Sequence, residues 1–255
     1  HTAYRRQRQM CIRDSTCTVE GTFELDASIM EGKDLSAGAV AGLKHVKHPI
    51  NAAYAVKTKS PHVMLSGAGA EEFAKEQGLE MVEDNMYFAT PKTMEWIEKL
   101  KQESKKNGTV GCVVLDKQGN LTAGTSTGGM FKKRWGRIGD SPVIGAGTYA
   151  DNNSCAVSCT GHGEYFIRHA VAFDVCARYK YLKESVEKAA DYIIHTELNT
   201  NAGNGGLIAV DKLGNIAMPY NSGGMFRGFL YKEKGSPEIK KGCGIGKKIV
   251  VVGEK

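Results

Sequence analysis

Two residues, Gly108 and Thr109, stand where the character of the chain changes abruptly. The preceding segment at 101–108, KQESKKNG, is polar, whereas TVGCVVLD at 109–116 is apolar and β-branched, as in a buried strand. If the peptide bond before Thr109 were cut, a new α-amine, with an unperturbed pKa of about 7.7–8, would lie beside the threonine's own hydroxyl. An N-terminal threonine of this kind is an activated nucleophile. From spacing alone, the commoner explanation is a β-branched residue that opens a strand.

Hydroxyl and charged side chains gather in the next segment. TSTGGMF at 125–131 places Thr127 before a glycine pair, and WGRIGDSP at 135–142 contains Arg137 and Asp140. The guanidinium of arginine suits bidentate capture of a carboxylate, and a carboxylate suits an ammonium. Arg137 and Asp140 held together would therefore recognise the α-carboxylate and α-amine of an amino acid. A surface ion pair is the commoner alternative.

A third candidate lies in SCTGHGEYF at 158–166. A strand is expected to end in Thr160 and Gly161, and a helix to start near Glu164. Backbone N–H groups and a hydroxyl at such a junction can form an oxyanion hole. His162 could act as a base, although a loop side chain near the pocket is the preferred interpretation.

Two glycine patterns resemble dinucleotide-binding loops but lack the full context. SGAGAEEF at 66–73 has Glu72 at the third glycine position, and VIGAGTYAD at 143–151 is followed by asparagines where a helix should run. A dinucleotide site needs both the glycines and the strand–helix context. Nucleotide binding is therefore the least favoured interpretation.

Periodicity places these candidates on strand ends and in the loops that follow them. Strands are expected at 22–30, 63–66, 109–116, 121–127, 143–149, 155–160, 205–211 and 216–222. Helical patterns are expected at 36–58, 70–77, 91–106, 164–181 and 185–197.

Two hairpins have similar sequences at a constant offset of 95 residues. The first has Asp116, Lys117, Gly119, Asn120, Gly128, Gly129, Met130 and Phe131, and the second has Asp211, Lys212, Gly214, Asn215, Gly223, Gly224, Met225 and Phe226. Their Gly-Asn turns tolerate positive φ, as hairpins require. With helices before and after them, two such hairpins predict an α+β or layered αββα fold.

Composition excludes several classes of protein. With 31 glycines against 6 prolines, the chain favours tight turns over a disordered linker. No apolar run approaches the roughly 18 residues that a membrane span needs. The 7 cysteines contain no CxxC pair, so neither a disulfide framework nor a zinc site is expected. This usage fits a reducing compartment.

Residues 1–14 are set apart by charge. They carry four arginines against Asp14, which accounts for half of the net charge of +6. A basic tail can bind nucleic acid, but this one lacks the apolar stretch of a secretory signal. We interpret residues 1–14 as a non-native, artefactual start and expect no nucleic-acid partner.

Six ordered stretches together resemble the plant-type asparaginase family of N-terminal-nucleophile hydrolases, which includes isoaspartyl peptidases. They are LDASIMEGKDLSAGAV (25–40), GTVGCVVLDKQGN (108–120), AGTSTGGM (123–130), GRIGDSPVIGAGTYADN (136–152), SCTGHGE (158–164) and GGLIAVDKLGN (205–215). The joint match is highly specific, although each stretch alone is not. It favours the functional interpretation of these segments over the alternatives given above.

The resemblance implies a four-layer αββα sandwich that hydrolyses L-asparagine and β-aspartyl (isoaspartyl) dipeptides. It implies self-cleavage between Gly108 and Thr109 into two subunits that stay together, commonly as a dimer of such heterodimers. The residues carried over by motif are Thr109 as nucleophile, Thr127 as support for its amine and hydroxyl, Arg137 and Asp140 for the substrate's α-carboxylate and α-amine, Thr160 and Gly161 as the oxyanion hole, and Gly163 as a backbone contact.

The family's N-terminal strand, its HGGAG-like turn and its NAGxGS-like loop have no counterpart in this sequence. Carbonyls of that loop commonly hold a structural sodium, so the resemblance implies a sodium loop that is largely missing and no cofactor for the reaction itself. We interpret 15–108 as a truncated α-subunit portion and 109–255 as the β-subunit portion of one structural domain. We expect no metal-ligating side chains, no membrane contact and a cytoplasmic location.

The nearest rival is a glycosylasparaginase-type amidase, which shares the TST and GDSP-like motifs. That relative usually has Asp before the nucleophile and a TGNGD-like oxyanion segment. Gly108 and TGHGE at 160–164 favour the asparaginase side. An inactive, uncleaved fragment is the alternative from a different class.

Overall fold

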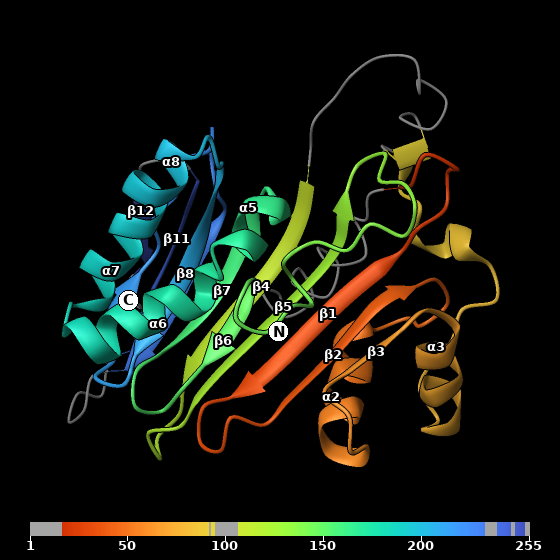
Figure 1. Cartoon of the computed structure of the whole chain (residues 1–255), viewed down its shortest axis with the longest axis horizontal. Coiled ribbons are helices and arrows are strands. Elements are labelled where there is room, and N and C mark those ends of the chain that lie inside the picture. The colour runs from red at the N-terminus through yellow and green to blue at the C-terminus, as the bar shows by residue number, and fades with distance from the viewer. Residues whose placement is uncertain (1–16, 92, 95–106, 233–238, 246–247, 253–255) are drawn as a thin grey trace.

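The computed structural model describes residues 17–91, 93–94, 107–232, 239–245 and 248–252 (Figure 1). The segment 1–14 and most of the helix expected at 91–106 lie outside these residues. The described elements mix helices with strands, which confirms the α+β class. Across the described ranges, no helix combines the length and the apolar character needed to cross a bilayer.

A five-stranded sheet carries the candidate nucleophile. In spatial order its strands are β3 (Met64–Ser66), β2 (Ala37–Leu43), β1 (Leu25–Glu31), β5 (Leu121–Met130) and β4 (Asn107–Leu115). Neighbours are antiparallel except β2 and β3. Among the described strands, β4 therefore has β5 alone as its ladder partner.

Successive side chains of β1 point to opposite faces of this sheet, and each face packs against a different layer. Ala27 belongs to an apolar cluster with Ala52 and Val56 of helix α2 (Pro49–Lys59), and Ala70 of helix α3 (Gly67–Glu76) belongs to the same cluster. The short 3-10 helix η1 (Asn85–Phe88) adds Phe88 to it. The opposite face of β1 points away from these helices, toward the second sheet (Figure 1).

The second sheet has four antiparallel strands, in the order β6 (Thr148–Ala150), β7 (Cys155–Gly161), β8 (Gly205–Asp211) and β9 (Ile216–Ala217). Its apolar cluster unites Val157 and Leu207 of the sheet with Val175 and Ile193 of the helices. The helical elements that follow β7 are α5 (Gly163–Arg168), α6 (Val171–Leu182), α7 (Val186–Tyr192), the π-helix η2 (Ile193–Glu197) and α8 (Leu198–Thr200). A three-stranded sheet of β10 (Arg227–Lys232), β11 (Ile239–Ile245) and β12 (Lys248–Val252) ends the chain.

The two larger sheets face each other through an apolar cluster and a hydroxyl network. Met30, Leu121 and Ala123 of the first sheet share a cluster with Ala156 and Val210 of the second.

Beside this cluster, buried hydroxyls link the sheets. Ser28 Oγ donates to Thr148 Oγ1 over 2.8 Å, and Thr125 Oγ1 lies 2.7 Å from Ser158 Oγ. Gly111 allows the close approach, because a Cβ at that position would overlap Ser158 Oγ. Strand β4, which carries the candidate nucleophile, is thereby held against β7.

Residues 36–58 do not form one helical segment, contrary to the expectation from sequence. Ala37–Leu43 is strand β2, and the helix α2 covers Pro49–Lys59. The strand consists of small residues, AGAVAGL, whose alternation is weak, and it lies between β1 and β3. Pro49 fits the first turn of a helix, which explains where α2 starts.

The helix expected at 164–181 is also interrupted. Ala170 adopts a left-handed conformation with φ of 46° between α5 and α6, at a position that no glycine marks. The break is held by tertiary contacts, because the N–H groups of Ala172 and Phe173 donate to the carbonyls of Ala146 and Gly145. The helix expected at 185–197 changes from α7 to a π-helix at Ile193, and the strand expected at 143–149 covers only Thr148–Ala150.

The two hairpins predicted to be equivalent share the same turn. Asp116 Oδ1 accepts the N–H of Asn120, and Asp211 Oδ1 accepts the N–H of Asn215. The second returning strand is much shorter than the expected 216–222, since it covers only Ile216–Ala217 before Pro219, which has no N–H to donate.

Candidate active site

The ladder between β4 and β5 changes register at the candidate scissile bond. Gly108 lies opposite Gly129, but Thr109 lies opposite Thr127. Gly128 is therefore an extra residue on β5, and it faces the peptide bond between Gly108 and Thr109. A bulge of this kind disrupts the regular hydrogen bonds of the ladder and twists the backbone locally.

The hydroxyl of Thr127 is the centre of this bulge. It donates to the carbonyl oxygen of Gly108 over 2.7 Å and accepts the N–H of Gly129 over 2.9 Å. Its oxygen lies 3.1 Å from the hydroxyl oxygen of Thr109. A single side chain thus contacts both the candidate nucleophile and the carbonyl of the peptide bond that precedes it.

A buried carboxyl group continues the same row of residues. Asp26 of β1 lies directly opposite Thr127, as Thr109 does on the other side. Directly opposed residues of antiparallel strands have their side chains on the same face. Asp26, Thr127 and Thr109 therefore line one row across the inner face of the sheet, and Asp26 is fully buried.

The candidate oxyanion residues lie across from this row, at the end of β7. Gly111 faces Ser158, and Val113 packs in the apolar cluster that contains Ala156. Because side chains alternate between the two faces of a strand, one step of two residues along β4 and β7 leads from Gly111 and Ser158 to Thr109 and Thr160. This alignment of the two strands therefore predicts that Thr109 lies near Thr160.

Gly161 follows Thr160 at a close approach to β8. A Cβ there would lie 2.7 Å from Gly205 Cα and would also overlap Asn204 O. The end of β7 therefore admits only glycine at this point.

Arg137, Asp140 and Gly163 lie close together in the structure. A Cβ on Gly163 would lie 2.8 Å from Arg137 Nη2 and 2.9 Å from Asp140 Oδ1, so the absence of a side chain makes the grouping possible. Arg137 donates from Nε and Nη2 to the two carboxylate oxygens of Glu164, over 2.9 and 3.0 Å. Asp140 is buried, and its Oδ2 has no hydrogen-bond partner within the described ranges.

The electrostatics of this group suit an incoming cation. Burial raises the pKa of Asp140 to about 7, although Arg137 opposes the shift. The hydrogen bond from Arg137 lowers the pKa of Glu164. An ammonium group placed against Asp140 would give its unpartnered oxygen a partner and would favour the carboxylate.

Three residues at this site were not predicted from sequence: Asp26, Lys133 and Glu164 as the partner of Arg137. An aspartate within the mostly buried strand β1 was a signal, because carboxyl groups are rarely buried without a partner. The sequence contains no comparable signal for Lys133, because lysine side chains are usually exposed. His162, which was weighed as a base, occupies the N-cap position of α5, half-buried beside Tyr165.

Comparison with known proteins places these features in a family. A family profile described as asparaginase matches residues 13–239. An isoaspartyl peptidase of Salmonella typhimurium is 48% identical over 228 residues, which cover 84% of this chain and 72% of that protein.

Two further relatives agree. An isoaspartyl peptidase of Escherichia coli is 44% identical, with 86% of this chain and 75% of the relative covered. An isoaspartyl peptidase/L-asparaginase of Homo sapiens is 41% identical, with 83% of this chain and 70% of the relative covered.

Proposed function

This chain belongs to the asparaginase family, and we propose on that premise that it is a threonine-dependent amidohydrolase matured by self-cleavage between Gly108 and Thr109. Its substrates are L-asparagine and β-aspartyl (isoaspartyl) dipeptides, in line with the names of its relatives. The observation that carries the proposal is the Thr127 hydroxyl, which contacts both the Gly108 carbonyl and the Thr109 hydroxyl at the bulge.

Self-cleavage is an N-to-O acyl shift. Thr109 Oγ1 attacks the carbonyl carbon of Gly108, and the hydroxyl of Thr127 stabilises the oxygen that becomes negative. The C–N bond then breaks, the nitrogen takes up the proton that Oγ1 gave up and becomes the α-amine of Thr109, and Gly108 is left as an ester on Thr109 Oγ1. Water hydrolyses this ester to release the carboxylate of Gly108 and the free threonine hydroxyl.

Substrate hydrolysis uses the same oxygen. The α-amine of Thr109 accepts the proton of Oγ1, which attacks the side-chain amide carbonyl of the substrate. Thr160 and Gly161 stabilise the oxyanion, a contribution of a few kcal/mol per donor in enzymes of this type. Ammonia or an amino acid leaves, and water then releases aspartate from the ester.

Arg137 and Asp140 hold the substrate's α-carboxylate and α-ammonium, and Gly163 leaves the space between them. The support is their common approach to Gly163 and the oxygen of buried Asp140 that has no hydrogen-bond partner within the described ranges. Glu164 already occupies two donors of Arg137, so it orients the guanidinium and leaves its remaining N–H groups for the substrate.

The architecture in this proposal is the four-layer αββα sandwich of N-terminal-nucleophile hydrolases. It is supported by apolar clusters that join each large sheet to its own helices, and by a third cluster between the sheets. Cleavage would divide one domain into the portions 15–108 and 109–255. The two portions stay together as a heterodimer, and two such heterodimers form the dimer.

The proposed chemistry needs no cofactor, because the chain supplies the nucleophile, the base and the oxyanion donors. The resemblance also implies a structural sodium ion held by loop carbonyls. No residue named here is assigned to that ion, and no step runs through it.

We also propose a cytoplasmic site of action. Its support is the cysteine usage of the sequence, which has 7 cysteines and no CxxC pair and fits a reducing compartment.

Purified protein tests the proposed substrates directly. Ammonia release from L-asparagine and amino acid release from a β-aspartyl dipeptide should both be measurable, and both should vanish in Thr109→Ala. A glycosylated asparagine serves as the comparison substrate. Hydrolysis of that compound alone would overturn the proposal in favour of the glycosylasparaginase alternative.

A further inference from the structure

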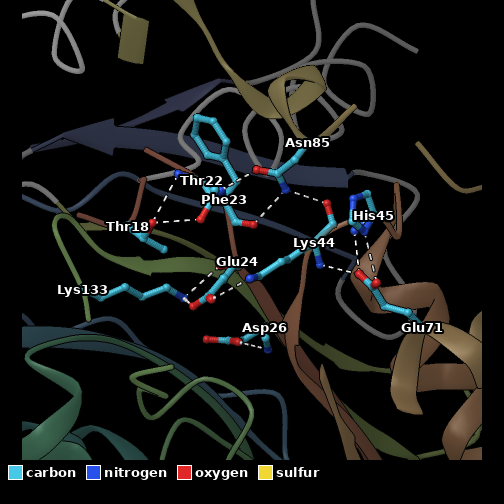
Figure 2. Close-up of polar contacts among 11 residues, drawn as sticks. Thr18, Thr22, Phe23, Glu24, Asp26, Lys44, His45, Glu71, Asn85 and Lys133 are labelled. Carbon is cyan, nitrogen blue, oxygen red and sulfur yellow. Dashed lines mark hydrogen bonds and ion pairs between the residues drawn. The ribbon is translucent and has the colours of Figure 1, made fainter. Parts of the chain in front are cut away.

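A buried lysine lies beside the proposed centre and has no part in the mechanism described so far. The side chain of Lys133 is only 1% exposed, and its Nζ donates to the backbone carbonyl of Glu24 over 2.9 Å (Figure 2). The carboxylate of Glu24 lies 3.7 Å away and is shared with Lys44. Burying an ammonium group is costly unless its charge is compensated, so its retention at this place requires an explanation.

Asp26 is a second buried charge near Lys133, whose ion-pair partner is Glu24. Its Oδ1 accepts the N–H of Gly42 over 2.8 Å, but its Oδ2 has no hydrogen-bond partner among the residues that the structure describes (Figure 2). Burial raises the pKa of Asp26, and the ammonium of Lys133 is the strongest influence in the opposite direction. The two groups are thus close enough to sense each other's charge.

Both groups adjoin the contacts made by Thr127. Thr127 of β5 lies between two cross-strand neighbours, Asp26 on β1 and Thr109 on β4. Lys133 Nζ lies 3.1 Å from the point where a Cβ on Gly129 would stand, and the N–H of Gly129 donates to Thr127 Oγ1. The ammonium therefore packs behind the bulge, and the carboxyl group lies in the same row as the nucleophile.

We propose that Lys133 and Asp26 are positioning residues of opposite charge that tune Thr109 through the bulge. The inference rests on the proposed function, because it concerns the same amine and the same carbonyl. The cation favours the uncharged amine, which is the form that accepts a proton, and it favours the negative oxygen formed during self-cleavage. The carboxylate of Asp26 adds negative charge beyond that of Glu24, which pairs with the cation, and it has the opposite influence on the amine.

Other charged or titratable groups surround the centre. They come from each element around it, namely Glu24 and Lys44 near β1 and β2, Arg137 and Asp140 in the loop after β5, Cys159 on β7, and His162 and Glu164 at the start of α5. Two of them respond to the substitutions, because the charge of Asp26 raises the pKa of Asp140 and Lys133 is paired with Glu24. The midpoint is therefore also read from kcat at saturating L-asparagine, where the substrate's ammonium already holds Asp140 as the carboxylate.

The test is the pH profile of kcat/KM for L-asparagine in fully cleaved protein. We compare the parent with three variants in which each new side chain is close in size to the original. Lys133→Met removes the cation, Asp26→Asn removes the carboxylate, and the double variant removes both. Removing the cation should move the acid midpoint up by about one pH unit, and removing the carboxylate should move it down. The double variant should return close to the parent. Lys133→Met should also slow self-cleavage about tenfold.

Opposite shifts are the decisive result, because a merely structural role would not reverse sign between the two substitutions. Midpoints that stay in place, or that move in the same direction, would overturn the inference. Thermal unfolding verifies that each variant is folded. If Lys133→Met alone does not fold, Asp26→Asn and the double variant still decide the matter. A parent that does not cleave before Thr109 contradicts the proposed function, whereas a cleaving parent with unmoved midpoints contradicts only this inference.

Discussion

Thr127 makes more of the critical contacts than the nucleophile itself. Its hydroxyl has one proton, and the structure directs that proton to the Gly108 carbonyl while its oxygen accepts from Gly129. The carbonyl that must become tetrahedral is therefore already polarised before cleavage. This arrangement makes Thr127 the residue whose loss should affect maturation most specifically.

We expect Thr127→Val to slow self-cleavage about 100-fold, since it removes one oxyanion donor while preserving the shape of the side chain. Thr127→Ser keeps the hydroxyl and is the matched control, with a rate within a few-fold of the parent. The rate is measured by mass spectrometry of purified precursor over time. Equal rates for the valine and serine variants would contradict the role assigned to this hydroxyl.

If Asp140 binds the substrate's ammonium as proposed, substrate binding depends on pH. Burial raises the pKa of Asp140 to about 7, so below that value it is protonated and loses its attraction for an α-ammonium. KM for L-asparagine should rise as pH falls through 7, by up to about tenfold per unit. Asp140→Asn should have a high KM with no such rise. Succinate, which has no amine, should not bind more weakly at low pH, and a parallel loss of its affinity would refute the assignment.

At the scale of elements, the close contact between β4 and β7 fixes the nucleophile relative to the oxyanion residues. Gly111 meets Ser158 without space for a side chain. Gly111→Ala should force the two sheets apart and lower the free energy of unfolding by about 1–3 kcal/mol. The control is Gly69→Ala in α3, where a Cβ would have no atom within 4 Å. Urea unfolding compares the two, and equal stabilities would show that this contact is not tight.

The sequence allowed Thr109, Thr127, Arg137 and Asp140 to be predicted because each lies in a motif, but their geometry could not be predicted. The bulge at Gly108 depends on strand register, which is decided by tertiary packing and not by residue type. Strand β2 was mistaken for helix because its small residues, AGAVAGL, carry no clear period. The left-handed Ala170 is imposed by contacts from Gly145 and Ala146, distant in sequence. Lys133 was missed because a lysine is ordinarily a surface residue.

At the scale of the whole molecule, the ladder between β1 and β5 joins the two halves that cleavage would create. It pairs residues from Asp26 with Thr127 to Glu31 with Thr122. Met30 of the first half also packs with Leu121 of the second. The cut itself lies in β4 and breaks none of these contacts.

The two products should therefore elute together in size-exclusion chromatography under native conditions and separate only under denaturing conditions. Met30→Asp places a charge in the cluster between the halves, and it should weaken their association. Elution of either product alone from the unmodified protein would mean that this interface does not hold the halves together.

The central claim is that Thr109 cleaves the bond that precedes it, and intact mass of the purified chain over a time course tests it most directly. We predict two fragments, the second of which begins at Thr109, together with a single uncleaved mass for Thr109→Ala under the same conditions. An uncleaved parent, or cleavage at another bond, would contradict the account.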